Sequence, residues 1–142
     1  MSWREIRPIA VGILWRDDEL LLQRFDGEET FYRPLGGGLE FEERAREALV
    51  REFREELDRE VTPIERLGVL ENVFTFEGTP GHEVVFVFEA EFADDSAYER
   101  ETLDGFEDSG QGSFTARWEP VSQFIDGEAT LYPDGLVGLL DD

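Results

Sequence analysis

The chain has 142 residues, with 35 Asp or Glu, 13 Lys or Arg and a formal net charge of −22. Its length predicts one domain, residues 1–142, and a chain this acidic lacks the basic clusters that nucleic-acid binding needs. The absence of cysteine excludes disulfides and thiolate chemistry, and the single histidine, His82, argues against a histidine-rich zinc site.

The first part of the chain predicts a β-hairpin followed by a short strand. Residues 6–15 are almost wholly apolar, which is typical of a strand buried on both faces. A polar turn at residues 16–18 and a second apolar segment at 19–25 complete the hairpin. Residues 31–35 are extended, because Pro34 disfavours helical angles at the preceding residue.

Residues 42–58 form the longest predicted helix, directly after three glycines. The residues that share its apolar arc are Leu49, Val50, Phe53 and Leu57. Glu52, Glu55 and Glu56 sit at i, i+3 and i+4, so a helix places them side by side. Carboxylates this close repel one another unless a cation lies among them, and Mg²⁺ prefers oxygen ligands.

Two long strands are predicted after the helix. Pro63 marks a break, and residues 64–77 then form a strand with a bend near Gly68. Residues 78–81 form a turn. Apolar residues alternate over 82–92, which is the clearest strand pattern in the chain.

The last third of the chain begins with an acidic, glycine-containing segment. We expect residues 93–112 to be a mobile loop with a short ordered piece at 98–103. A final strand covers 114–119. A short helix reaches residue 125, and another covers 134–140, because proline is favoured at the start of each.

The spacing around the long helix is the strongest functional signal. Gly37 is followed by five residues, Glu43, seven more residues and then Arg51-Glu52-Phe53-Arg54-Glu55-Glu56. This pattern resembles the Nudix box, the signature of hydrolases that cleave a nucleoside diphosphate linked to another moiety. The box covers about residues 37–59, and the flanking strands extend the resemblance to most of the chain.

The pattern departs from the family at its end. Asp58 stands where the family has glycine, and Arg59 stands where the family has an apolar residue. Those two positions end and pack the helix and carry no phosphate chemistry. The departures therefore concern the helix C-terminus more than the activity.

The resemblance implies an α/β fold of the Nudix type, an α/β/α sandwich with a mixed β-sheet and one long catalytic helix. It also implies a metal-dependent pyrophosphohydrolase that uses Mg²⁺ or Mn²⁺. The substrate would be a small nucleotide diphosphate derivative. Divalent metals would neutralise the phosphoryl oxygens and lower the pKa of a bound water.

By resemblance, three carboxylates of the helix hold the metal. Glu55 and Glu56 are direct ligands, and Glu52 is a further ligand or the group that orients or deprotonates water. The same residues could instead form an ordinary solvated acidic face, which is common in so acidic a chain. The matching positions outside the cluster make that alternative the weaker one.

Four further positions have supporting roles by resemblance. Glu43 supports the site, for example through metal-bound water, and Arg51 orients a carboxylate rather than contacting substrate. The backbone around Gly36 and Gly37 could offer a carbonyl ligand. Without the rest of the box, the glycines at 36–38 would indicate only a flexible turn.

Outside the box the candidates are weaker. Arg33, Arg24 and Arg7 could bind phosphate, although salt bridges on strands are equally compatible with their positions. Aromatic residues that could stack on a base are Phe31, Tyr32, Phe74 and Phe76. Candidates for a distal catalytic glutamate are Glu99, Glu101 and Glu107. His82 fits a structural role at a strand end, and Trp118 fits packing.

Two other functions compete with hydrolysis. A non-catalytic nucleotide-binding sensor on the same fold would bind nucleotide without turning it over, and an acidic interaction domain would have no small-molecule site. Family members are often dimers, and the apolar strands could support a homodimer. Because no apolar leader or long apolar run is present, we expect a cytoplasmic protein without a membrane partner.

Every basic residue is arginine, and lysine is absent. Abundant Asp and Glu without lysine resembles the proteins of salt-accumulating halophilic archaea, whereas hyperthermophile proteins tend to gain lysine together with glutamate. At about 1 M salt the Debye length falls to roughly 3 Å, which screens the self-repulsion of the chain. We therefore expect structure to be lost when salt is removed; a merely acidic mesophilic protein is the alternative.

Overall fold

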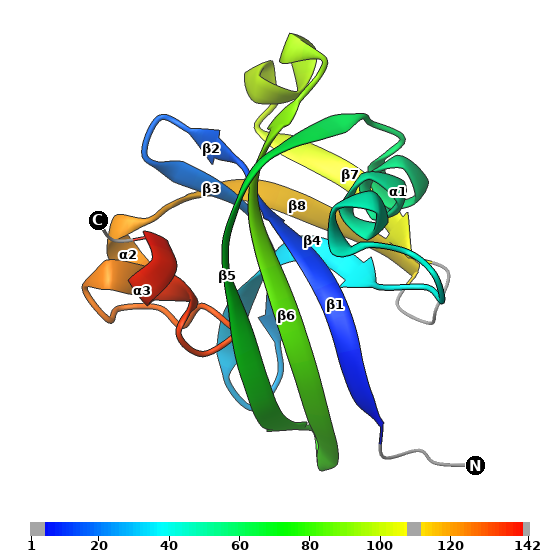
Figure 1. Ribbon diagram of the computed structural model, residues 1–142. Coiled ribbons are helices and arrows are strands. Elements are labelled where there is room, and N and C mark those ends of the chain that lie inside the picture. Colours follow the sequence, from blue (N-terminus) through cyan, green and yellow to red (C-terminus); the bar gives the residue numbers. More distant parts are fainter. Residues whose placement is uncertain (1–4, 108–111, 141–142) are drawn as a thin grey trace.

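The computed structural model describes residues 5–107 and 112–140 as one mixed β-sheet with helices on both sides (Figure 1). The strands are β1 (Ile6–Ile13), β2 (Trp15–Arg16), β3 (Glu19–Asp26), β4 (Thr30–Gly38), β5 (Val61–Phe76), β6 (Thr79–Phe92), β7 (Thr102–Glu107) and β8 (Gly112–Pro120). The helices are α1 (Ala45–Leu57), the 3-10 helix η1 (Asp95–Glu99), α2 (Ser122–Ile125) and α3 (Leu136–Leu140).

The sheet has the strand order β5-β6-β1-β4-β3-β8-β7, with β2 paired to β3. β1 and β6 run parallel, and the other pairs of named strands are antiparallel. The predicted α/β class and mixed sheet are therefore confirmed. The parallel pair lies inside the sheet, between the edge strand β5 and β4, and β1 is buried from Ile9 onwards.

Two apolar cores lie on opposite faces of the sheet. The helix α1 covers one face and α2 and α3 cover the other, as Figure 1 shows. Residues that α1 contributes to its core are Ala48, Leu49, Phe53 and Leu57. The sheet alternates side chains between the two faces, so Ala10 faces the α1 core while Ile9 and Val11 face the other core. This arrangement fixes α1 against the centre of the sheet.

The predicted hairpin is wrong for most of its length. β1 pairs with β4 and β6, and the two-residue strand β2 alone returns onto β3 around the Asp17–Asp18 turn. An apolar strand carries no signal for which neighbour it pairs with, so adjacency in sequence was misleading. The consequence for the site is direct, because β1 brings its backbone against the glycines of β4.

Three other boundaries differ from the prediction. Pro63 lies inside β5 rather than before it, which is tolerated because β5 is an edge strand with a register shift between Pro63 and Glu65. The turn is shorter than predicted, since Phe76 already pairs with Thr79. Helix α1 begins three residues later than predicted, after the N-cap residue Arg44.

The predicted acidic loop also contains a strand. β7 pairs with β8 from Thr102 to Glu107, although its residues are mostly polar and Leu103 is the one buried residue that it contributes. Within the same predicted loop, residues 108–111 lie outside the described part of the chain. The ordered strand carries Glu107 toward α1, which the loop prediction did not anticipate.

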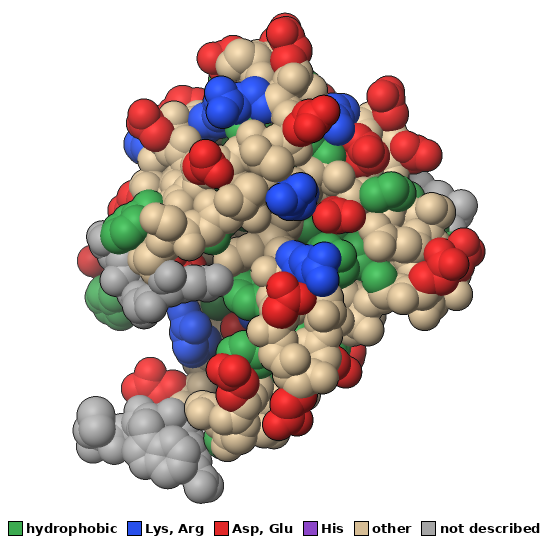
Figure 2. Space-filling view, turned by 180° about the vertical axis from the view of Figure 1, so that it is seen from behind, with side chains coloured by type: hydrophobic (Ala, Val, Ile, Leu, Met, Phe, Trp, Pro, Cys, Tyr) green, Lys and Arg blue, Asp and Glu red, His purple; other side chains and the backbone are tan. Residues whose placement is uncertain are grey.

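The surface is dominated by acidic side chains. Figure 2 shows Asp and Glu spread over the whole of one face, with arginines in small groups among them. In the described residues, no helix is long and apolar enough to cross a membrane.

Candidate active site

Two glutamate side chains accept hydrogen bonds from backbone N–H groups at the start of α1 and just before it. The backbone N–H of Arg44 donates to Glu47 at 2.8 Å, which satisfies one of the free amides at the helix start. The backbone N–H of Glu40 donates to Glu43 at 2.9 Å. These bonds fix the segment that leads from the glycines of β4 into the helix.

Arg51 lies at the centre of a carboxylate cluster. Its guanidinium donates to both oxygens of Glu43 (2.7 and 3.0 Å), to Glu52 (3.1 Å) and to Glu55 (3.1 Å). It also donates to the carbonyl oxygen of Gly38 at 2.8 Å. The hydrogen bond from Arg51 lowers the pKa of Glu43, and Glu43 and Glu52 raise the pKa of Arg51. The planar fork of arginine therefore ties the helix to the end of β4.

Glu56 lies beside Glu52 in a partly buried environment. Burial raises its pKa to about 9, assisted by a hydrogen bond with Glu52 and by the negative charges of Glu52, Glu107 and Glu55. Two carboxylates this close do not both ionise without a compensating cation. Glu56 is therefore protonated at neutral pH in this structure.

The three predicted ligands are not gathered at one point. Glu52 and Glu56 are adjacent, whereas the Glu55 side chain is 59% exposed and bonds Arg51 on the outer side of the helix. Among the described residues, no group of three or more carboxylates or imidazoles converges as a ready-made metal site. The donors are nonetheless all oxygen atoms, and the raised pKa of Glu56 marks a place that lacks positive charge, which suits a hard divalent cation.

Gly37 allows the Glu52 carboxylate to lie against β4. A Cβ atom at this position would fall on the carboxylate of Glu52, so a side chain here would displace it. A Cβ atom at Gly36 would instead collide with the carbonyl oxygen of Ala10 on β1. Both glycines are therefore required by close approach, and the carbonyl in this segment that accepts a bond from the cluster is that of Gly38.

A groove of 460 Å³ runs over this cluster. Its charged and polar lining residues are Arg7, Gln23, Arg33, Glu40, Arg51, Glu52, Glu55, Glu56, Glu83 and Glu107. Glu107 comes from β7, and neither Glu99 nor Glu101 is among the residues that line the groove. Arg24 bonds Asp26 at 3.0 Å instead of reaching it. The sequence offered Glu107 only as one of three equivalent glutamates, because the strand that positions it was missed.

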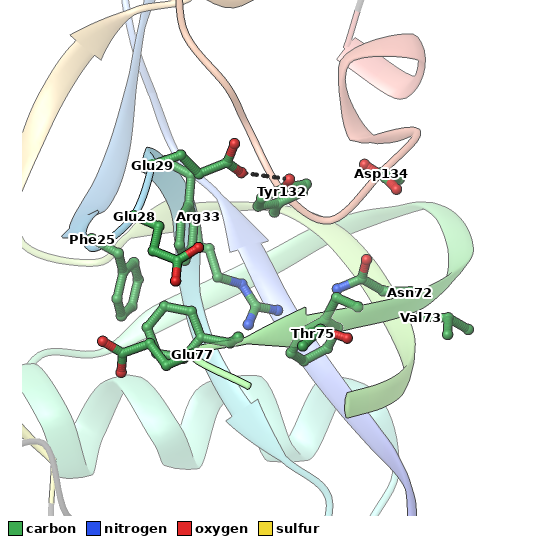
Figure 3. Close-up of a pocket in the computed structure, with 13 residues that line it drawn as sticks. Phe25, Glu28, Glu29, Arg33, Asn72, Val73, Thr75, Glu77, Tyr132 and Asp134 are labelled. Atoms are coloured by element: carbon green, nitrogen blue, oxygen red, sulfur yellow. Dashed lines mark hydrogen bonds between the residues drawn. The ribbon is translucent and has the colours of Figure 1, made fainter. Parts of the chain in front are cut away.

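A second cavity of 560 Å³ adjoins the groove and is shown in Figure 3. Phe25 and Arg33 line both spaces. Three of the aromatic candidates, Phe31, Phe74 and Phe76, line this cavity, whereas Tyr32 packs in the core.

Two buried polar residues line these spaces, Asn72 the cavity and Glu83 the groove, and sequence reasoning singled out neither as a site residue. Glu83 is 5% exposed and accepts a bond of 2.8 Å from Arg33, and Asn72 is 3% exposed. The signal that could have revealed them is a polar residue at an apolar position of a strand pattern. Such a residue is expected to be buried, and a buried polar group needs a hydrogen-bond partner. His82, the neighbour of Glu83, pairs with Val73 in the β5–β6 ladder.

Comparisons with known proteins identify the family and the fold. The model of the NUDIX domain matches residues 6–135. The fold is similar to a NUDIX hydrolase from Nitrosomonas europaea, with a TM-score of 0.65 and 17% identity over 96% of this chain and 86% of that one. It is also similar to a MutT protein from Methanosarcina mazei Go1 (TM-score 0.64, 17% identity, 98% and 93% coverage). A third similar structure is an ADP-ribose pyrophosphatase from Streptococcus suis (TM-score 0.57, 14% identity, 95% and 89% coverage). The chain belongs to the Nudix hydrolase family.

Proposed function

We propose that the protein is a divalent-metal-dependent pyrophosphohydrolase that cleaves a nucleoside diphosphate linked to another moiety. The observation that carries this proposal is the adjacent carboxylate pair Glu52 and Glu56 on the wall of a groove that also contains arginines, in a chain of the Nudix family. A pyrophosphate group needs both of these elements, because metals and arginines neutralise different phosphate oxygens.

Glu52 and Glu56 would hold Mg²⁺ or Mn²⁺, with Glu55, which lines the same groove, as the third carboxylate. The bound metal would neutralise phosphoryl oxygens and activate water for attack on phosphorus. Because Glu56 carries a proton at neutral pH without metal, loading the site would release that proton. Glu43 and Arg51 would keep the helix and the Gly38 backbone in place during this change.

The arginines of the groove divide into two kinds. Arg51 uses its guanidinium on Glu43, Glu52, Glu55 and Gly38, so it acts as a positioning residue. Arg7 and Arg33 line the groove from the sheet and would bind phosphate oxygens, although Arg33 also donates to Glu83 at 2.8 Å. Glu107 is the distal carboxylate that could accept a proton from the attacking water.

A substrate panel tests the proposal. Wild-type protein and Glu56→Gln are assayed in molar KCl with Mg²⁺ or Mn²⁺ against nucleoside triphosphates, oxidised nucleoside triphosphates, ADP-ribose, nucleotide sugars and dinucleoside polyphosphates. The panel must be broad, because the similar structures include an ADP-ribose pyrophosphatase and a MutT protein. The exposed Glu65 on β5 supplies the matched control, Glu65→Gln.

Turnover by wild type and Glu65→Gln, but not by Glu56→Gln, is the expected result. No turnover by folded wild type, together with nucleotide binding, would contradict the proposal and favour the non-catalytic sensor. Neither turnover nor binding would favour an acidic interaction domain.

The proposal extends to cellular context. The acidic, lysine-free composition supports a protein from the cytoplasm of a salt-accumulating halophilic archaeon. Exposed apolar side chains on the edge strand β5, namely Ile64, Val69 and Val73, support a homodimer. Light scattering in molar KCl distinguishes monomer from dimer.

A further inference from the structure

Arg33 and Glu83 form an ion pair in the wall of the glutamate groove. The Nη2 atom of Arg33 donates to Oε1 of Glu83 at 2.8 Å, although the two residues are 50 positions apart in the sequence. Arg33 lies on β4 and Glu83 on β6, and β1 separates these strands in the sheet. At Arg33, β4 pairs with β3, because its pairing with β1 begins only at Leu35. A side-chain contact, rather than backbone pairing, therefore connects Arg33 to β6.

Glu83 is a buried carboxylate that needs the charge of Arg33. It is 5% exposed, and its strand is paired on both sides. Asn72 also donates to its Oε1, at the longer distance of 3.4 Å. Figure 3 shows the Arg33 guanidinium extending from its strand toward the side on which Asn72 lies. A buried carboxylate is costly without a counter-charge, so Glu83 holds the guanidinium in one place.

Stability alone gives little reason for this pair. Taking two charged groups out of water costs about as much as their attraction returns, and apolar side chains of similar size often serve a core as well. Side chains two positions apart on a strand share one face of the sheet. Val85 and Val87 follow Glu83 on its face of β6, and both are fully buried. An apolar residue at position 83 would continue this row, so the carboxylate indicates a role for its partner Arg33.

The Arg33 guanidinium keeps donors for a ligand. Its side chain is 21% exposed in the groove wall, and among the described residues its one hydrogen-bond partner is Glu83. Arginine carries five N–H donors in a planar fork, so the remaining donors are available to a phosphate oxygen. A guanidinium that is already held at one end loses less conformational entropy when it binds a ligand.

We propose that Glu83 is a positioning residue, which holds the Arg33 guanidinium so that its free N–H groups bind an oxygen of the pyrophosphate. This role rests on the proposed function, which assigns the pyrophosphate to the glutamate groove. Arg7 on β1 is the register partner of Glu83 and also lines the groove. In the part of the chain that the structure describes, however, Glu83 forms its ion pair with Arg33 alone. Arg33 is therefore the arginine that Glu83 orients.

Binding of methylenediphosphonate tests this role without turnover, because water does not cleave the carbon bridge of this pyrophosphate analogue. Isothermal titration calorimetry in molar KCl with Mg²⁺ compares wild type with Arg33→Leu, Glu83→Leu and the double variant. We expect each single variant to bind about tenfold more weakly or worse, which is the scale of one charge-assisted hydrogen bond. The double variant should bind no more weakly than Arg33→Leu, because Glu83 acts through Arg33.

The melting temperatures of the same variants separate positioning from folding. Each single variant leaves one charge of the pair uncompensated and should melt at a lower temperature than wild type. The double variant replaces both charges with apolar groups, so its melting temperature should recover, while its binding should stay weak. Recovery of wild-type binding together with stability would overturn the proposal, because the pair would then be only structural.

A control on the same strand accompanies these variants. Glu91→Leu makes the same change at an exposed position of β6 and should bind the analogue as wild type does. If the leucine variants do not fold, Arg33→Gln and Glu83→Gln, which remove the charges and keep polar ends, replace them in the same comparison. Wild-type affinity in folded Glu83→Leu, a further loss in the double variant, or no binding by wild type would overturn the proposal.

The two proposals fail separately. If wild type binds the analogue with this coupling but turns over none of the substrate panel, the pyrophosphohydrolase proposal fails and the role of Glu83 stands. If wild type hydrolyses members of the panel and Glu83→Leu binds the analogue as wild type does, the role of Glu83 fails and hydrolysis stands.

Discussion

Glu56 links the chemistry of the site to the stability of the metal-free protein. Its pKa is raised to about 9, chiefly by burial, whereas in the unfolded chain it returns to about 4.5. The folded state therefore keeps a proton that the unfolded state loses between these two values. The free energy of unfolding is therefore highest, as far as Glu56 is concerned, below pH 4.5, and this contribution is lost as the pH rises through about 9.

We predict that Glu56→Gln removes this pH dependence. The melting temperature of the metal-free variant should match that of wild type near pH 5 and exceed it by about 3 °C or more near pH 9, since about 1 kcal/mol or more of ionisation cost is removed. Differential scanning calorimetry across that range measures the difference. Glu65→Gln, on the exposed side of β5, should show no such trend. A constant Glu56→Gln difference at every pH would contradict the explanation.

Gly37 gives a second prediction at the same scale. Alanine there places a methyl group on the Glu52 carboxylate, so Gly37→Ala should lower kcat/KM by about tenfold or more while leaving the protein folded. At Gly138 on α3, away from the groove, a Cβ atom would meet nothing within 4 Å. Gly138→Ala is therefore the matched control and should retain the activity. Equal activities for the two variants would show that the Gly37 contact is unimportant.

Residues close in sequence were predicted better than residues brought together by the sheet. The spacing from Gly37 to Glu56 indicated the cluster because a helix and its leading loop fix those distances locally. Asn72 and Glu83 are 11 residues apart and meet through the β5–β6 pairing, for which a single sequence carries no register signal. The roles of the predicted ligands stay predictions until the metal is tested.

At the scale of elements, the C-terminus of α1 shows how this chain tolerates its departure from the family pattern. The helix ends at Leu57, and Asp58 adopts φ 55° and ψ 41° while its N–H donates to the carbonyl of Arg54 at 3.1 Å. This left-handed conformation is the one that glycine favours at the end of a helix. Aspartate reaches it more readily than most residues, so the helix still ends in the expected place.

We predict that Asp58→Gly stabilises the protein by roughly 0.5–1 kcal/mol, because glycine adopts the left-handed conformation without steric cost. Asp58→Val should destabilise it, since a β-branched side chain is poorly compatible with positive φ. Urea unfolding of the two variants beside wild type, with unchanged m-values, measures the effect. A stabilising Asp58→Val would contradict it.

The elements that sequence reasoning misplaced are those whose identity depends on a neighbour. β7 is polar and short, and it becomes a strand because β8 pairs with it from Thr102 to Glu107. Pro63 looked like a break, yet an edge strand has one side on which no backbone donor is needed. The helix and the alternating strand β6 were predictable because their apolar periods are long and local.

For the molecule as a whole, charge is the dominant property. A net charge of −22 on 142 residues means that folding brings like charges together over the entire surface. Figure 2 shows these acidic side chains distributed rather than confined to one patch. Local pairs such as Arg54 with Glu60, at 2.6 Å, offset a small part of the repulsion, because only 13 basic residues are available.

We predict that stability rises steeply with salt. Between about 0.1 M and 1 M KCl the Debye length falls from roughly 10 Å to 3 Å, so repulsion between separated carboxylates is largely removed. The melting temperature should rise by about 10 °C or more over this range, which corresponds to roughly 3 kcal/mol or more for a chain of this size.

A variant with Glu65, Glu71 and Glu91, all exposed, changed to Gln should gain stability in dilute buffer and little in molar KCl. Because neutralising the charges and screening them relieve the same repulsion, the two gains should not add. Additive gains, or a melting temperature unaffected by KCl, would show that the acidic surface is not what limits the folded state.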